Sequence, residues 1–164
     1  MRTAALLAAL LLWAGAASAA PPKATLVKVD KAGRTLQVFA GQTLLATYPI
    51  VLGRNPVGHK TREGDKRTPE GRYVLDYKNP RSAYHLSIHV SYPNAADRAQ
   101  ARAQGVPPGG DIMIPGQPNN AAFRRYLELR PPYDWTDGCI ALSNADMKAL
   151  WDQVQVPVPI QIDP

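Results

Sequence analysis

The sequence predicts a mainly β domain of the α+β class, in which a sheet encloses one hydrophobic core and helices cover its open sides. Three observations predict it. Short apolar runs separated by turn residues fill the first half of the chain, and helical patterns are interspersed in the second half. The chain of 164 residues shows no repeat, low-complexity tract or inter-domain linker, so we expect one core.

The first 19 residues are expected to be a signal peptide. Arg2 supplies a positive start, residues 4–17 form an apolar run, and Ala17-Ser18-Ala19 has the small side chains of a cleavage site. A membrane anchor is the alternative, but a run of about 14 residues falls short of the roughly 20 that a spanning helix needs. Cleavage would leave an exported domain of residues 20–164 with no stable membrane span.

Strand patterns dominate the first half of the domain. The segment 24–51 is typical of strands joined by tight turns, and the segment 73–77 resumes the pattern. In the segment 86–92 apolar and polar residues alternate, which turns His89 away from the aliphatic face. The polar residues 53–71 are rich in Gly and Pro and predict structured loops, which often carry function.

Helices are expected in the second half. One runs from Asn94 to Gln104, is capped by Asn94 and is ended by Gly105, and another covers 120–129. The clearest helix begins at Ser143 with the spacing of a capping box. Its apolar side chains recur at helical intervals and indicate a core-facing side: Met147, Leu150, Trp151 and Val154.

Two further strands complete the expected elements. A short strand covers 111–114, and another covers 156–162 near the end of the chain. The second contains Pro157 and Pro159, which have no backbone N–H to donate. It is therefore expected at an edge of the sheet.

The charge balance predicts an acidic partner. There are 19 Lys and Arg against 13 Asp and Glu, a formal net charge of +6. Export favours an acidic polymer or an anionic membrane, so no nucleic-acid partner is expected. A basic surface that only keeps the protein in solution is an equally good interpretation.

The single cysteine is the sharpest compositional feature. In an exported protein it has no partner for an internal disulfide. Cys139 follows Gly138 and precedes the helix expected at Ser143, so nearby backbone amides would lower the thiol pKa and bind an oxyanion. Intermolecular pairing and passive burial of a small apolar side chain are the alternatives.

The segment Thr136-Asp137-Gly138-Cys139-Ile140 resembles the Ser/Thr-His-Gly-Cys motif of the L,D-transpeptidase, or YkuD-like, catalytic domain family. Residues 53–71, 86–94 and 105–114 resemble the branch typical of Gram-negative bacteria, and the likeness extends over roughly residues 24–162. It implies a β-sandwich with short covering helices and a periplasmic location. It also implies peptidoglycan stem peptides as substrates.

In the chemistry that this resemblance implies, Cys139 attacks a stem-peptide carbonyl, releases D-alanine and forms a thioester. An amine of a second stem or of an outer-membrane lipoprotein, or water, then resolves the thioester. Thr136, Asp137, Gly138 and Gly116 are the residues expected to bind the oxyanion or substrate. No cofactor is implied.

The chain departs from the family where a general base is expected. The family's Ile-His-Gly segment is Ile114-Pro115-Gly116 here, and proline cannot transfer a proton. Asp137 replaces a second family histidine. It could have a catalytic role, or it could be a loop carboxylate that accepts hydrogen bonds from backbone amides.

His89 is the preferred substitute base, because strand alternation turns it to the polar face. A structural histidine bonded to a neighbouring side chain is the more common alternative, and His59 and His85 have weaker claims. His85 and His89 share a strand face, but two histidines without a third ligand do not predict a zinc site, so no metal is expected.

Three functions are therefore open. The first is an acyl-transfer enzyme, either an L,D-transpeptidase or a hydrolase of the same fold that cuts stem-peptide or lipoprotein cross-links. The second is a catalytically impaired homologue that binds peptidoglycan, because of Pro115. The third is a structural envelope protein with a buried cysteine. Several cations could contact stem carboxylates, although solubility explains them equally well: Lys60, Arg62, Lys66, Arg67, Arg124, Arg125 and Arg130.

Overall fold

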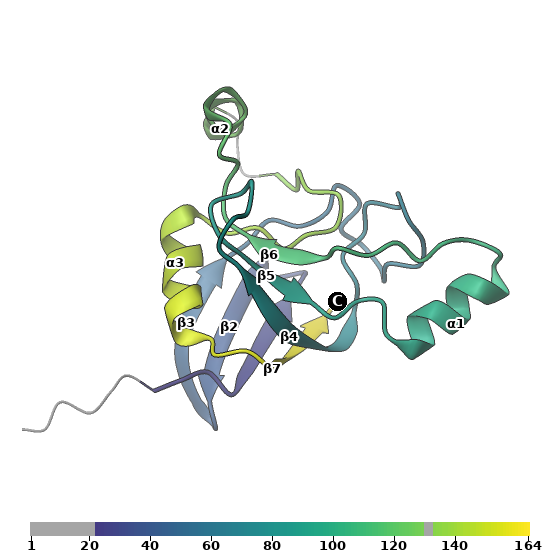
Figure 1. Cartoon of the computed structure of the whole chain (residues 1–164), viewed down its shortest axis with the longest axis horizontal. Helices are drawn as coiled ribbons and strands as arrows, with labels where there is room; N and C mark the ends of the chain where they lie inside the picture. Colours follow the sequence, from purple (N-terminus) through teal and green to yellow (C-terminus); the bar gives the residue numbers. More distant parts are fainter. Residues whose placement is uncertain (1–21, 130–132) are drawn as a thin grey trace, which may run out of the picture.

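The computed structural model describes residues 22–129 and 133–164, so the expected signal peptide, residues 1–19, lies outside the described residues. The described chain forms one seven-stranded sheet and three helices (Figure 1). The strands are β1 Leu26–Asp30, β2 Thr35–Ala40, β3 Thr43–Pro49, β4 Gly71–Asn79, β5 Ser87–Val90, β6 Met113–Pro115 and β7 Val158–Asp163. The helices are α1 Ala95–Ala103, α2 Ala121–Glu128 and α3 Asn144–Gln153. The mainly β class is confirmed, with a single curled sheet as its frame.

The sheet has the strand order β3-β2-β1-β7-β4-β5-β6. Neighbouring strands are antiparallel except β1 and β7, which are parallel. The first three strands form a meander, as the tight turns of the segment 24–51 predict. The last strand in sequence returns to the middle of the sheet and joins this meander to the β4-β5-β6 half.

The expectation that the last strand lies at an edge is wrong, because β7 is paired on both sides. Pro159 is opposite Val74 on β4, but the Val74 backbone N–H and carbonyl bond to Ser91 instead. The nitrogen of Pro159 therefore faces β1, where pairing begins only with Val27 opposite Ile160. A proline is tolerated in this central strand because its missing N–H lies beyond the start of the β1 ladder.

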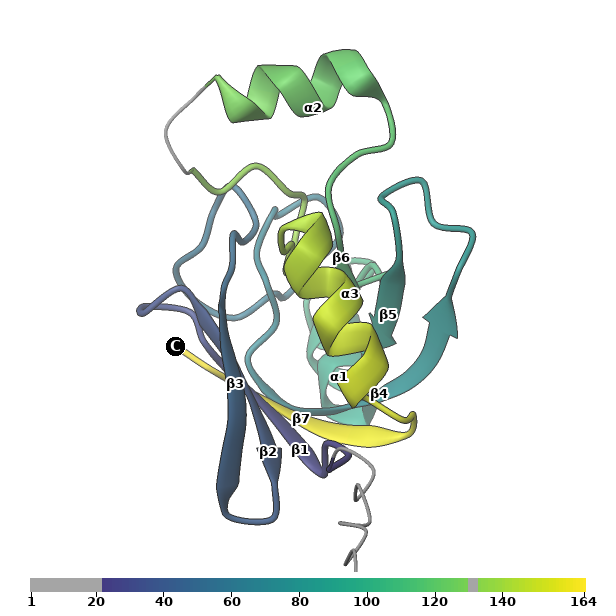
Figure 2. The same cartoon turned by 90° about the vertical axis from the view of Figure 1, so that its left-hand side faces the viewer.

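The core fills the concave side of the sheet. Alternate residues of the strands point inward, and Val27, Val29, Leu36, Val38 and Leu75 are all 0% exposed. Figure 2 shows α3 lying across this concave side, where Met147 and Leu150 are also fully buried. Burial of each such side chain contributes roughly 1.5–3 kcal/mol, so the core accounts for most of the favourable free energy of folding.

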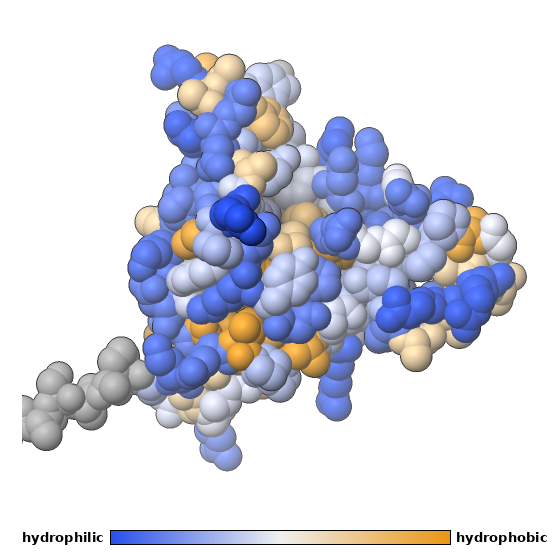
Figure 3. Space-filling model, in the orientation of Figure 1, coloured by the Kyte–Doolittle hydropathy of each residue, from blue (hydrophilic) through white to orange (hydrophobic). Residues whose placement is uncertain are grey.

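All three expected helices are present, with the predicted caps at Asn94 and Ser143 and a further cap at Asn120. Asn94, Asn120 and Ser143 accept hydrogen bonds from backbone N–H groups of α1, α2 and α3. The α1 helix is anchored by Asp97, which accepts hydrogen bonds from the Tyr73 hydroxyl and from His59 Nε2. The α2 helix has no buried residue and stands away from the body of the molecule, as the space-filling view also shows (Figure 3).

No helix among the described residues is long and apolar enough to cross a membrane. The same residues contain no group of three or more His, Cys, Asp and Glu side chains that could hold a metal ion.

Candidate active site

Cys139 is held at one end of the sheet by backbone hydrogen bonds on both sides of its segment. On one side, the backbone N–H of Ile140 donates to Met113 of β6 at 3.0 Å. On the other side, Ala141 and Val51 exchange backbone hydrogen bonds of 2.9 and 3.0 Å. The thiol therefore sits on a rigid frame rather than on a loose loop, and α3 begins five residues later at Asn144.

The turn before Cys139 is organised by Thr136, which is 4% exposed. Its hydroxyl donates to the Cys139 carbonyl at 2.7 Å and accepts from the backbone N–H of Gly138 at 3.1 Å. Gly138 has a φ of 133°, a conformation that side chains rarely adopt. A Cβ there would also lie 2.7 Å from the Arg67 carbonyl oxygen, so only glycine fits.

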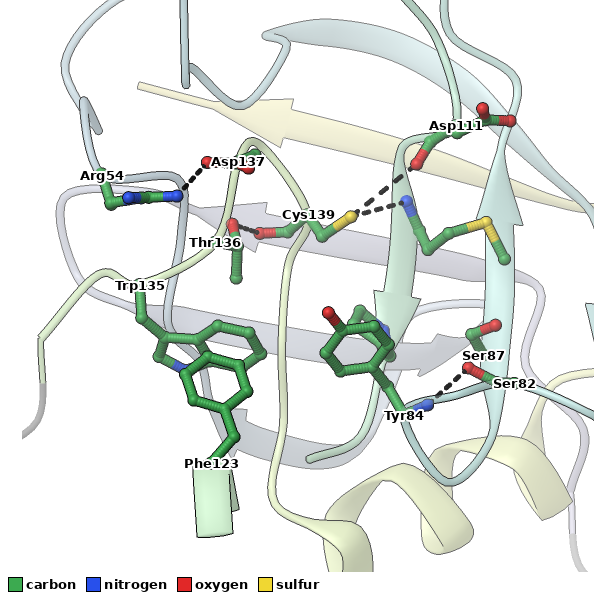
Figure 4. Close-up of a pocket in the computed structure, with 12 residues that line it drawn as sticks. Arg54, Ser82, Tyr84, Ser87, Asp111, Phe123, Trp135, Thr136, Asp137 and Cys139 are labelled. Carbon is green, nitrogen blue, oxygen red and sulfur yellow. Dashed lines mark hydrogen bonds and ion pairs between the residues drawn. The ribbon is translucent and has the colours of Figure 1, made fainter. Parts of the chain in front are cut away.

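The Cys139 sulfur has two backbone neighbours. The backbone N–H of Met113 points at the sulfur with an N···S distance of 3.5 Å, and the Asp111 carbonyl lies 3.7 Å away (Figure 4). Burial is the largest influence and raises the pKa of the Cys139 thiol above its ordinary value. The Met113 hydrogen bond lowers this pKa, and the charges of Asp137 and Asp111 raise it again. The net effect favours the thiol over the thiolate.

Cys139 lines an open pocket of about 440 Å³, a size typical of small-ligand sites. One wall is aromatic: the Trp135 ring is stacked on Tyr84 with 6.1 Å between centroids, and Phe123 of α2 meets Trp135 edge-on at 5.8 Å. Ser82, Ser87, Met113 and Pro115 line the pocket near the β5 and β6 strands. The pocket thus combines an apolar wall with a thiol and hydroxyl groups.

An exposed ion pair forms the rim. Arg54 Nη2 lies 2.5 Å from Asp137 Oδ1, with side chains 50% and 71% exposed. Such a pair contributes little to stability because water screens it, so either partner can be exchanged for a charged ligand at small cost.

The pocket contains no histidine among the described residues that line it. Pro115, which stands in place of the family histidine, is one of those residues. No other histidine has therefore been brought to this position from elsewhere in the described chain, and the acidic residues of the lining are Asp111 and Asp137.

His89 lies on β5 beside the pocket rather than in its lining. Its Nδ1 is 2.7 Å from Asp76 Oδ1, and its ring is stacked on Tyr77 with 4.6 Å between centroids. In the strand register His89 is opposite Met113, whose side chain lines the pocket. This is the arrangement expected of a structural histidine bonded to a neighbour.

The other two histidines are also placed by structural contacts. His59 Nδ1 accepts the backbone N–H of Glu70 at 2.9 Å, so Nε2 carries the proton that it shares with Asp97 at 3.1 Å. His85 precedes β5 and has a φ of 64°. The expectation that it shares a strand face with His89 is therefore wrong.

The expected oxyanion and substrate residues divide into two groups. Thr136 and Asp137 line the pocket with Cys139. Gly138 lies behind it, and its amide is occupied by Thr136. Gly116 is packed against Asn144 and donates its amide to the Tyr84 and Leu86 carbonyls, so its backbone is engaged in holding the fold together.

Sequence reasoning missed Arg54, Tyr84, Ser87 and Phe123 as pocket residues. Strand alternation places Ser87 on the same face as His89 and could have indicated it. The other three come from separate loops and from α2, and no local pattern connects them to Cys139.

A family comparison covers nearly all the described chain. The model of the L,D-transpeptidase catalytic domain, YkuD, matches residues 24–162. The chain belongs to this family. The extent of the match equals the range over which the sequence resembles the family, and the curled, mainly β sheet is consistent with the family's fold.

Individual relatives of this L,D-transpeptidase domain match it to different extents. YafK of Escherichia coli (strain K12), named as an L,D-transpeptidase, is 34% identical over 79 residues, which are 44% of this chain and 32% of YafK. The helical cell shape determining protein Pgp2 from Campylobacter jejuni has a TM-score of 0.65 and 27% identity over 87% of this chain and 48% of Pgp2. The chain thus spans about half the length of Pgp2, and its match to YafK covers about a third of YafK.

A third comparison concerns the fold alone. The L,D-transpeptidase from Xylanimonas cellulosilytica, residues 123–326, has a TM-score of 0.54 and 14% identity, and the match covers 87% of this chain and 62% of that one. The same sheet is therefore built from very different sequences.

Proposed function

We propose that this L,D-transpeptidase domain is an exported enzyme that modifies peptidoglycan by acyl transfer, with Cys139 as the nucleophile. The observation that carries the proposal is the position of the thiol. It faces an open pocket of about 440 Å³ with an aromatic wall, in a domain of the L,D-transpeptidase family. A cysteine kept only for packing would be enclosed by apolar side chains.

In the proposed first step, the Cys139 thiolate attacks the carbonyl carbon of a stem-peptide bond. The carbonyl π electrons move to oxygen and, as they return, the C–N bond breaks. D-alanine leaves after its nitrogen has taken up, through solvent, the proton that the thiol lost on ionising. A thioester remains on the sulfur. The Gly138 amide is occupied by the Thr136 hydroxyl, so the amide of Cys139 itself is the proposed oxyanion donor.

In the second step, an amine attacks the thioester carbon, its nitrogen loses a proton to solvent, and the C–S bond breaks to return the sulfur as thiolate. The amine belongs to a second stem peptide or to an outer-membrane lipoprotein, and water in its place gives hydrolysis. Because the substrate lies in the cell wall, we propose a periplasmic location after removal of the signal peptide, residues 1–19.

A second function is favoured by a specific observation, namely Pro115 in the pocket without a histidine to replace it. With the thiol pKa raised by burial, little thiolate forms at neutral pH. A homologue that binds peptidoglycan stems and transfers them very slowly or not at all is compatible with this geometry. The same pocket would then act as a binding site.

Mass spectrometry of the intact protein distinguishes the two functions. The chain is incubated with a stem tetrapeptide or with a carbapenem, and the acyl-enzyme function predicts an adduct that is absent in Cys139→Ala. Cys139→Ser is a matched control, because it keeps the shape of the side chain with a much weaker nucleophile. Binding of the tetrapeptide without any adduct, at neutral or alkaline pH, would assign the second function.

A further inference from the structure

The hydroxyl of Ser87 is a buried polar group in the wall of the Cys139 pocket. Ser87 is the first residue of β5 and is only 2% exposed, although it lines the pocket. It is opposite Pro115 in the strand register, and Pro115 and Met113 line the same pocket from β6. Residues that face each other across two strands project from the same side of a sheet. The side chain of Ser87 therefore points to the pocket side.

The Ser87 hydroxyl has no hydrogen-bond partner in the protein within residues 22–129 and 133–164. A serine hydroxyl has one donor and two acceptor sites, and buried polar groups in native proteins are nearly always paired. Among the same residues, the one side-chain nitrogen or oxygen that is both sealed from solvent and unpaired is Arg67 Nε. The Ser87 oxygen is thus unpaired but not sealed, so a molecule in the pocket can reach it.

The other hydroxyls near the pocket wall are engaged in building it. Thr136, which is 4% exposed, donates to the Cys139 carbonyl at 2.7 Å. The Ser82 hydroxyl accepts the backbone N–H of Tyr84 at 3.1 Å. Ser87 is at least as buried as Thr136, but its hydroxyl contributes no hydrogen bond to the fold. It is therefore available to a bound group.

Ser87 and Cys139 lie on opposite sides of β6 (Figure 4). On one side, Ser87 of β5 pairs with Pro115. On the other side, the segment that follows Cys139 bonds to the same residue, because the Leu142 N–H donates to the Pro115 carbonyl at 3.0 Å. Neighbouring strands lie about 4.8 Å apart, so roughly 10 Å separates the two sites. An extended peptide covers that distance in about three residues.

We propose that the Ser87 hydroxyl binds a backbone amide in the N-terminal half of the peptidoglycan stem peptide, while Cys139 faces the carbonyl near its other end. A hydroxyl both donates and accepts, which matches the N–H and C=O of an amide. The charged residues of the described lining, Arg54, Asp111 and Asp137, lie at the Cys139 end (Figure 4). The Ser87 end therefore suits a neutral group, because an unpaired charge is costly to bury.

The ligand's identity in this proposal rests on the proposed function, whereas the binding role rests on the unpaired hydroxyl. Direct binding tests it without turnover, by NMR titration of the chain carrying Cys139→Ala. The ligands are the stem tetrapeptide and the dipeptide formed by its last two residues. Ser87→Ala in that background should weaken binding of the tetrapeptide about 3- to 10-fold, the usual effect of losing one hydrogen bond. It should leave the weaker binding of the dipeptide unchanged, because the dipeptide is too short to reach β5.

Thermal unfolding provides a second measurement. Ser87→Ala should leave the melting temperature unchanged or raise it, because no hydrogen bond within the protein is lost. Ser91→Ala is the matched control, since the Ser91 hydroxyl accepts the backbone N–H of Val74 at 2.9 Å and Ser91 is not part of the pocket lining. The same substitution at Ser91 should lower the melting temperature and leave the binding of both peptides unchanged.

Three results would overturn the proposal. Equal binding of the tetrapeptide by the Cys139→Ala parent and by the Ser87→Ala variant would show that water alone satisfies the hydroxyl. An equal loss for both peptides would place the effect at the Cys139 end of the pocket. A lower melting temperature for Ser87→Ala would show that the hydroxyl serves the fold.

The two proposals fail separately. An adduct on Cys139 with no effect of Ser87→Ala on binding would leave the acyl-transfer function standing and remove the amide contact. Tetrapeptide binding that depends on Ser87, with no adduct under any condition, would keep the amide contact in a protein that only binds stems.

Discussion

The backbone N–H of Met113 donates to the sulfur of Cys139, with an N···S distance of 3.5 Å. Met113 is the first residue of β6, so the edge of the sheet itself orients the thiol. This hydrogen bond favours the thiolate, but the burial of the sulfur outweighs it. The reactivity of Cys139 should therefore be limited by ionisation.

The rate at which Cys139 reacts with iodoacetamide should rise about tenfold per pH unit through the neutral range and show no plateau below about pH 9. The thiolate is the reactive form, and a raised thiol pKa moves its formation to higher pH. Asp137→Asn should increase the rate at neutral pH, because it removes a charge that raises the thiol pKa. A plateau near pH 7 would contradict the expected ionisation state.

Pro115→His should increase acylation by the tetrapeptide at neutral pH by about 10²- to 10⁴-fold, the usual contribution of a general base. The physical reason is that residue 115 lines the same pocket as the sulfur. Single-turnover mass spectrometry measures the rate. Pro115→Gln is the control, since the glutamine side chain is polar and similar in length to histidine but does not take up the thiol proton. Equal rates for both variants would show that the proton is not limiting.

His89→Gln should change the acylation rate by less than about threefold and lower the free energy of unfolding by about 1 kcal/mol. The imidazole is hydrogen-bonded to Asp76 and stacked on Tyr77, and it is not part of the pocket lining. Kinetics and urea denaturation on the same preparation separate the two effects. A fall in rate of 10²-fold or more with unchanged stability would assign His89 as the base.

Gly138→Ala should lower the free energy of unfolding by about 2–4 kcal/mol, through strain at a positive φ and a clash of its Cβ with the Arg67 carbonyl. Gly41→Ala is the matched control: it has a φ of 58° but nothing within 4 Å of the added Cβ. Gly41→Ala should lower the free energy of unfolding by about 1–2 kcal/mol, from backbone strain alone. Urea denaturation compares them, and equal losses would show that the contact with Arg67 is relaxed without cost.

Local features of the structure were predictable from the sequence. The caps at Asn94 and Ser143 depend on atoms three residues apart, and the strand alternation around His89 depends on its immediate neighbours. The buried face of α3, with Met147 and Leu150, follows from helical spacing. Each of these signals is contained within a few consecutive residues.

Non-local features of the structure were not predictable from the sequence. The central position of β7 depends on where the β1 ladder begins, which makes Pro159 harmless. The partner of His89 depends on the register between β5 and β4, where a bulge displaces the pairing. Neither the strand order nor the bulge can be predicted from the residues of the segment that it affects.

By itself the sequence determined the kinds of elements, their caps, the resemblance to a family and the unusual Pro115. Only the tertiary structure decided which side chains surround Cys139 and that burial raises the pKa of its thiol. The physical reason is that turns and helices are stabilised by contacts between near neighbours in the chain. A pocket, its local dielectric and its unpaired charges arise where segments distant in sequence meet, and that depends on how the sheet curls.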